Sequence, residues 1–342
     1  MTIRKPAKAA KNCLSVRAEY SRETAEVSIR YAMEEEMKQE KDFAFLISAY
    51  TEPESLCNLV RELECLESAD FYIHIDRKAD ISPFRALLDN LGYTNISYTK
   101  ERFKVYWGGY SQVLMQQAMI CEMLESGTKY SRVVNITGTD FPVAGPEQLR
   151  AALLDPDQEF IIGFDVENEI GSGVGKEPNI TKFSRLYRMD TYHYVSSVIL
   201  RLHIRNPYFK DRDKKMFFGS EYWALTYDCV KDIYDRYRDD IKLQTLLRYS
   251  YVPSEAWVHT MFFNSDWKNR CRYPLQTKYI GLDPLAPLTY FDYRDKIKVL
   301  TLEDYDAVVG SKKLFARKII VGKSDALVEK IKKTRADLTF EL

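Results

Sequence analysis

The stretch Phe43–Tyr50, FAFLISAY, is a continuous apolar run of strand length. Such a run is typical of a β-strand buried on both faces, as in a parallel sheet. The turn-forming segment Thr51–Pro53 follows, and the segment Glu54–Glu67 then carries apolar residues at helical spacing, namely Leu56, Leu59, Val60, Leu63 and Leu66. The sequence therefore predicts a buried strand that leads into an amphipathic helix.

Further strands and helices follow in alternation. Phe71–Asp80 begins as a strand, Phe84–Leu91 has helical spacing, and Asn95–Thr99 is a third strand. Another strand starts at Tyr130 and ends in the polar turn Thr137–Asp140. This alternation predicts an α/β fold with a mostly parallel central sheet flanked by helices, in which ligands bind beyond the carboxyl ends of the strands.

Acidic residues occur at two of these strand ends. Asp76 follows the second strand, where a carboxylate suits the hydroxyls and amides of a nucleotide, although an acid that only shapes the turn is an equal alternative. Asp140 follows a later strand without a companion Asp-x-Asp. The Asp-x-Asp strings at 155–157 and 211–213 have the character of surface turns. We therefore expect no metal site.

Length and composition limit the possible classes. The chain has 342 residues, more than the roughly 250–300 that one core usually supports. We expect one large domain at 41–342, with a nucleotide-binding half at about 41–145 and an acceptor and catalytic half at about 146–342. Lys plus Arg and Asp plus Glu each number 50, so no net charge attracts nucleic acid. The 24 tyrosines favour a sugar or nucleotide ligand, although large cores also use aromatics.

Residues 1–40 lack the strand pattern, so we expect an N-terminal extension that is helical or disordered. Residues 1–36 are predicted to be dispensable, because a start at Met37 would place the first strand a few residues into the chain. The six cysteines form no CxxC pair, no signal peptide opens the chain, and no apolar run reaches the roughly 18–20 residues of a membrane span. We therefore expect a cytoplasmic enzyme without a transmembrane segment, with peripheral attachment at the inner membrane face as an alternative.

The stretch Tyr249–Asn264, YSYVPSEAWVHTMFFN, is where we predict the chemistry. Pro253 fixes its own φ, Ser254 is expected to cap the helix, and the positions that follow are largely apolar. Glu255 would then be held on a rigid turn, as a general base requires when it must reach a substrate hydroxyl. The alternative is a first-turn acid favoured by the helix dipole.

Polar and aromatic residues suited to sugar binding recur along the chain. The candidates are Trp107, Gly108, Ser220, Glu221, Trp223 and Trp257. Gly108 allows the backbone to approach a ligand closely. Arg317 and Lys318 interrupt the apolar run Leu314–Ile320, where buried cations require an anion such as a diphosphate.

Six segments in order carry a resemblance. They are IHIDRK, VYWGGYS, NITGTDFPV, GSEYWALT, VPSEAWVHT and LFARK, between about Asp42 and Ile320. Together they resemble the core-2/I-branching enzyme family, glycosyltransferase family 14, which includes β-1,6-N-acetylglucosaminyltransferases and peptide O-xylosyltransferases. Each motif is weak alone, but six in this order are specific.

The resemblance implies a GT-A type fold and an inverting transfer of a sugar, GlcNAc or xylose, from a UDP-sugar to a hydroxyl of a glycan or other acceptor. The family's base falls on Glu255, and its diphosphate-binding lysine falls on Lys318. That lysine replaces a metal, so no metal or other cofactor is expected. Asp76 falls on the nucleotide-contacting aspartate, and Asp140 falls on the turn beside the donor. The second diphosphate cation is expected among Arg294, Lys296 and Lys298.

The chain departs from the family at Tyr50, Ser254 and Thr289, which stand in place of His, Asp and Arg. These departures leave the donor sugar open. The absence of paired cysteines and of a membrane anchor favours a bacterial-type member. A non-catalytic carbohydrate-binding protein is the competing class, and it would need neither Glu255 nor Lys318. A hydrolase would need an opposed second carboxylate, for which Glu221 is the candidate.

Overall fold

The structure is a computed structural model that describes residues 40–168, 179–190, 198–199, 202–293 and 296–341. The predicted dispensable segment 1–36 and the candidate cation Arg294 lie outside the described residues.

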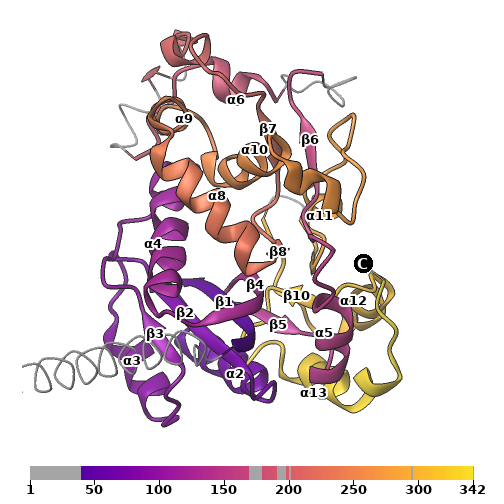
Figure 1. Cartoon of the computed structure of the whole chain (residues 1–342). Helices are drawn as coiled ribbons and strands as arrows, with labels where there is room; N and C mark the ends of the chain where they lie inside the picture. Colours follow the sequence, from indigo (N-terminus) through magenta and orange to yellow (C-terminus); the bar gives the residue numbers. More distant parts are fainter. Residues whose placement is uncertain (1–39, 169–178, 191–197, 200–201, 294–295, 342) are drawn as a thin grey trace, which may run out of the picture.

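A five-stranded sheet forms the centre of the molecule (Figure 1). Its strands are β1 (Glu40–Ala49), β2 (Ala69–Ile75), β3 (Ile96–Tyr98), β4 (Lys129–Thr137) and β8 (Ala224–Leu225), in the order β3-β2-β1-β4-β8. The first four run parallel, with Phe45 of β1 beside Phe71 of β2 and Val134 of β4, and β8 is antiparallel to β4. The predicted α/β fold with a mostly parallel sheet is confirmed.

The apolar run of β1 serves both faces of this sheet because successive side chains point to opposite sides. Phe43, Phe45 and Ile47 belong to a core with α2 (Pro53–Glu64) and α3 (Ser82–Asp89). Ala44 and Leu46 belong to a second core with α4 (Ser111–Glu125) and α8 (Tyr227–Asp239). The sheet is thus enclosed between helices, which explains why β1 shows no alternation of polar and apolar residues.

Two smaller sheets complete the strand content of the described residues. The strand β6 (Gly163–Asp165) pairs with β7 (Phe217–Gly219). The strands β5 (Asp140–Pro142), β10 (Phe315–Arg317) and β9 (Thr289–Phe291) form a three-stranded sheet beside the lower end of β4 in Figure 1. The remaining α-helices are α5 (Pro146–Leu153), α6 (Thr181–Ser184), α9 (Ile241–Arg248), α10 (Trp257–Phe263), α11 (Leu282–Leu285), α12 (Tyr305–Gly310) and α13 (Asp325–Thr334).

Two segments differ from what their sequence favours. The segment FFGSEYWALT at 217–226 has the apolar character of one strand, but it is divided between β7 and β8, with Ser220–Trp223 between them. Ser254 does not cap α10, because Pro253–Glu255 forms a separate 3₁₀ turn and α10 begins only at Trp257. Among the described helices, none has the length and apolar character needed to cross a membrane.

Candidate active site

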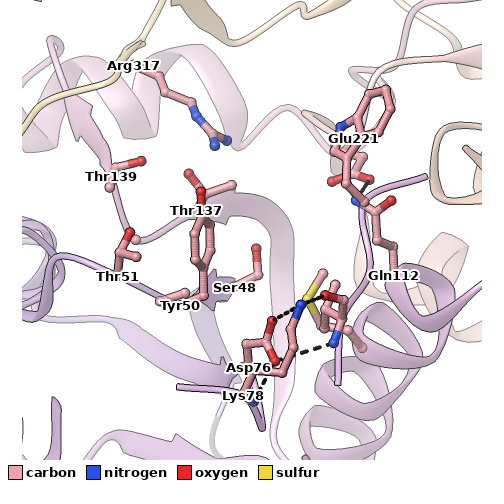
Figure 2. A pocket seen from close by; sticks show the side chains of 15 residues that line it. Ser48, Tyr50, Thr51, Asp76, Lys78, Gln112, Thr137, Thr139, Glu221 and Arg317 are labelled. Atoms are coloured by element: carbon pink, nitrogen blue, oxygen red, sulfur yellow. Dashed lines mark hydrogen bonds and ion pairs between the residues drawn. The ribbon is translucent and has the colours of Figure 1, made fainter. Parts of the chain in front are cut away.

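A cavity of about 350 Å³ opens beyond the carboxyl ends of β1, β2 and β4 (Figure 2). Its lining comprises Ser48, Ala49, Tyr50, Thr51, Asp76, Lys78, Val105, Trp107, Gln112, Met115, Thr137, Gly138, Thr139, Glu221 and Arg317. In Figure 2, Arg317 enters from the side opposite Asp76, and Glu221 lies beside Gln112 on a third side. This is the edge at which parallel α/β sheets bind ligands.

Asp76 directly follows β2, and its backbone N–H is held by the carbonyl of Ala49 at the end of β1. Its Oδ1 atom accepts the backbone N–H of Lys78 at 2.8 Å and that of Val105 at 3.3 Å. Lys78 Nζ lies 3.5 Å from Oδ2. Asp76 therefore shapes the turn and also lines the cavity, so the two sequence-based alternatives are not exclusive.

Arg317, at the end of β10, supplies positive charge to the cavity. Its guanidinium donates a hydrogen bond to the hydroxyl of Tyr222, and its Nε lies 4.0 Å from Oδ1 of Asp140. Burial acts against the charge of Arg317, but Tyr222 and Asp140 outweigh it, so the pKa of the guanidinium is raised. Asp140 itself is buried and accepts the backbone N–H and hydroxyl of Thr137. Asp140 thus forms an ion pair with Arg317 but does not itself line the cavity.

Lys318 does not line the cavity, but it lies beside Arg317 on the segment that continues β10. Its backbone N–H bonds to the carbonyl of Lys298, and Ile319 N–H bonds to the carbonyl of Thr139 at the cavity edge. Burial and the charge of Arg317 lower the pKa of the Lys318 ammonium, with a smaller contribution from Lys296. The site therefore concentrates positive charge at this wall.

The structure separates the two described candidates for the second cation. Lys298 Nζ lies 2.6 Å from Oδ1 of Asp304, so this ammonium is already paired with a carboxylate. Lys296 is exposed and close enough to Lys318 to affect its pKa. Lys296 is thus the better placed of the two.

Glu255 stands on a turn that is anchored at several points. Val252 N–H donates to the carbonyl of Gly108, and Tyr251 N–H donates to the carbonyl of Lys182. The first residue of the following helix, Trp257, is fully buried, and its indole N–H donates to Gln116 Oε1. These contacts fix the backbone on both sides of Glu255.

Glu255 and Glu221 are electrostatic neighbours. Burial raises the pKa of Glu255, the negative charge of Glu221 raises it further, and Lys182 acts in the opposite direction. Burial also raises the pKa of Glu221, against the Ser254 hydroxyl and Arg317. Both side chains keep some solvent access, and Glu221 lines the cavity, whereas Glu255 adjoins Glu221 and is not part of the lining. A raised pKa is the property expected of a carboxylate that exchanges protons near neutral pH.

The other predicted sugar-binding residues divide into those at the cavity and those in the core. Trp107 lines the cavity and is 69% exposed, with its ring edge-on to Tyr251 at 5.6 Å. Gly108 has a positive φ of 73°, and a Cβ added there would lie 3.0 Å from the ring of Tyr251, so both the backbone conformation and this contact favour glycine. Ser220 is buried, and its hydroxyl accepts the backbone N–H of Tyr222.

The assignment of Trp223 and Trp257 to a sugar-binding wall was wrong for a physical reason. The two side chains are only 1% and 0% exposed, and both belong to the apolar core with α4 and α8. An aromatic ring binds sugar through an accessible face, which neither residue offers. They act instead as packing anchors for the segments that carry Glu221 and Glu255.

Most of the cavity lining was not predicted from the sequence, and four of the missed residues act on the charged groups of the site. They are Lys78, Gln112, Lys182 and Tyr222. Gln112 Nε2 lies 3.4 Å from Glu221 Oε1, while its Oε1 accepts the N–H of Gly108. Helical spacing places Gln112 one turn after Gly108, but only the fold shows that it reaches β7–β8. Lys182 lies in the short helix α6, within a part of the sequence that shows no recognisable periodicity.

The acidic strings outside the cavity are satisfied locally. Asp155 accepts the N–H of Asp157 and the amide of Gln158, and Asp213 pairs with Lys242 at 2.9 Å. In the described part of the chain, no three His, Cys, Asp or Glu side chains gather as a metal site would require.

Comparison with known proteins points to one family. The family model described as Core-2/I-Branching enzyme matches residues 43–274, which is more than half of the chain. Xylosyltransferase oxt of Drosophila melanogaster is 25% identical over 238 residues, covering 63% of this chain and 25% of that protein. Xylosyltransferase 2 of Homo sapiens is 28% identical over 201 residues, covering 57% of this chain and 21% of that protein. The match thus spans about a quarter or less of the length of these relatives. The chain belongs to the Core-2/I-Branching enzyme family, which confirms the resemblance carried by the motifs and the GT-A type fold that it implies.

Proposed function

We propose that this chain transfers a sugar, with inversion, from a UDP-sugar to a hydroxyl of an acceptor glycan or other acceptor. Glu255 is the general base, and Arg317 with Lys318 stabilises the departing diphosphate. The observation that carries the proposal is one cavity at the strand ends with Arg317 on one wall and, on another, Glu221, the electrostatic neighbour of Glu255.

The donor is proposed to bind along the ends of β1, β2 and β4. Asp76 lies where the nucleotide's hydroxyls or amides would be recognised, and Thr51, Thr137 and Thr139 add polar groups to the lining. The Arg317 guanidinium has five N–H donors, of which Tyr222 accepts one. The other donors remain for diphosphate oxygens.

The reaction then needs one displacement. The acceptor hydroxyl gives its proton to the Glu255 carboxylate while its oxygen forms a bond to the anomeric carbon. The bond from that carbon to the diphosphate oxygen breaks, and UDP leaves with the electron pair. Fixed cations near the leaving oxygen stabilise the charge that develops there, without reorganisation during the reaction.

Two further features of the proposal concern the donor and the metal. The names of the matching relatives favour xylose, with GlcNAc as the alternative that the motifs also allow. Arg317, Lys318 and Lys296 place cations around the proposed diphosphate position, so the proposal includes no metal.

The test is Glu255→Gln, which keeps the shape of the side chain but cannot accept a proton. UDP release would be measured with UDP-xylose, UDP-GlcNAc, UDP-glucose and UDP-galactose in the presence of sugar acceptors. We expect turnover to fall by about 100- to 10,000-fold, the usual contribution of a general base, while UDP affinity stays within twofold. Glu329→Gln, which removes an exposed carboxylate from α13, is the matched control. Turnover at the wild-type rate in Glu255→Gln would reject the assignment of the base.

A further inference from the structure

A second cavity, of about 440 Å³, lies next to the proposed donor cavity. Its lining comprises Phe103, Lys104, Tyr106, Tyr110, Ser111, Leu114, Arg188, Asp190, Arg248 and Tyr249. None of these residues lines the donor cavity. The volume is within the usual range of roughly 300–1,000 Å³ for small-molecule sites.

Positive charge and aromatic rings dominate this second cavity. Lys104, Arg188 and Arg248 are exposed cations, and the guanidinium of Arg248 lies 5.4 Å from the ring centre of Tyr110. In the part of the chain that the structure describes, neither Lys104 nor Arg248 forms an ion pair with a carboxylate. A concave surface with excess charge of one sign concentrates the opposite ion. The cavity therefore favours an anionic ligand.

The one carboxylate in the lining, Asp190, offsets one of the three cations. Asp190 accepts the hydroxyl of Ser111 at 2.5 Å and the backbone N–H of Ser111 at 3.2 Å. It thus caps the start of α4 and is occupied there. Lys104, Arg188 and Arg248 less Asp190 leave the lining with a formal charge of +2.

The aromatic residues indicate that the anion is attached to a sugar. Tyr106 and Trp107 are adjacent and exposed, and Tyr106 lines the second cavity while Trp107 lines the donor cavity. The segment Tyr249–Glu255 makes the same connection, because Tyr249 lines the second cavity and Tyr251 packs against Trp107. A sugar ligand that occupies both cavities needs more than one residue, so it is an oligosaccharide.

We propose that the second cavity binds an anionic sugar residue, one that carries a carboxylate or sulfate, further along the acceptor chain whose hydroxyl meets Glu255. The acceptor class is thus an acidic oligosaccharide. This inference rests on the proposed function in one respect, namely that the other end of the acceptor oligosaccharide lies at Glu255. Binding of the anionic sugar in the second cavity does not depend on catalysis.

The test is calorimetric titration of the full chain with a heparin-derived tetrasaccharide, which is acidic, and with chitotetraose, which is neutral. We expect the acidic tetrasaccharide to bind wild type more tightly, and Lys104→Ala/Arg248→Ala to weaken it by about tenfold, as the loss of two exposed charge contacts predicts. The affinity for chitotetraose should change less than twofold. Binding should persist in Glu255→Gln, so the result does not depend on the catalytic assignment.

A matched control removes the same charge from another concave surface. Lys215 and Lys268 line a separate cavity with Tyr273, and Lys215→Ala/Lys268→Ala should leave the tetrasaccharide affinity unchanged. An equal loss in both double variants would show a general charge effect and overturn the proposal. Equal wild-type affinity for the two tetrasaccharides, or equally tight binding of hexaglutamate, would also overturn it, as would a parallel fall in UDP affinity in Lys104→Ala/Arg248→Ala.

Discussion

Two walls of the proposed donor cavity differ in how neighbouring groups affect the protonation of their side chains. On the cationic wall, formed by Arg317 and Lys318, the guanidinium has Asp140 and Tyr222 behind it. On the carboxylate wall, Glu221 lines the cavity and Glu255 is its electrostatic neighbour outside the lining, so two like charges adjoin, and Lys182 opposes them at Glu255. The cationic wall therefore keeps its arginine charged, whereas the carboxylate wall favours the uptake of a proton.

This difference assigns a task to each wall. A group that must stabilise negative charge needs to stay charged throughout the reaction, and the partners of Arg317 ensure this. A general base must instead gain a proton during the reaction and lose it afterwards, which a raised pKa makes possible near neutral pH. Burial raises the pKa of both carboxylates. The two walls are thus suited to the two ends of one displacement.

The largest effect is expected from the cationic wall. Arg317→Gln removes the charge that faces the cavity, and we expect kcat/KM for UDP-sugar turnover to fall by about 100- to 1,000-fold, as for other fixed groups that stabilise a developing charge. Arg317→Lys should recover part of this loss, because it keeps the charge but not the planar fork. Steady-state kinetics on the three proteins would measure both effects.

The stability of these variants needs its own measurement, because Arg317→Gln leaves Asp140 buried without its cation. Burial already raises the pKa of Asp140 to about 6, against the effect of Arg317. Loss of Arg317 would raise that pKa further, and a neutral Asp140 costs little to bury. Thermal melting should therefore show a folded protein. A loss of activity that only follows the unfolded fraction would remove Arg317 from the catalytic machinery.

The sequence predicted the type of a helix or strand correctly where a single pattern of apolar residues determined it. The strand from Phe43, the helix that follows it and the strand after Lys129 have the predicted types, since a buried parallel strand has a distinctive continuous apolar run. Asp76 and Arg317 were found for a related reason, as charges at the end of or within such runs.

The rest of the site depends on contacts that no local pattern reveals. Glu221 is exposed to the cavity because the apolar segment at 217–226 breaks between β7 and β8, although its composition favours one strand. Trp223 and Trp257 have the composition of a sugar site but pack in the core, since only the tertiary fold decides which aromatic face stays accessible. Lys182 lowers the pKa of Glu255 from the four-residue helix α6, which is too short to show a helical pattern in the sequence, so this effect could not be predicted.

A smaller effect is expected when the charges around Glu255 are changed. Because the Glu221 charge raises the pKa of Glu255, Glu221→Gln should lower that pKa and move the acid limb of the kcat/KM profile to lower pH. Lys182→Met should move the limb to higher pH, because Lys182 acts to lower the same pKa. Each shift should be about one unit or less, since about 1.4 kcal/mol between neighbours corresponds to one unit. Shifts in the same direction for the two variants would contradict the assignment of the limb to Glu255.

The smallest effect is expected from chelation. If the cationic wall performs the task that a divalent metal performs in other transferases, its charges remain after EDTA treatment, because Arg317 and Lys318 are covalently part of the chain. EDTA would be added at about ten times the concentration of any contaminating metal. We therefore expect the rate of UDP release to stay within experimental error of the untreated rate. Arg317→Gln provides the sharper comparison, since added manganese should not restore its activity unless the cavity also binds metal. Loss of wild-type activity in EDTA that manganese restores would show that a metal, and not the cationic wall, carries the charge of the leaving diphosphate.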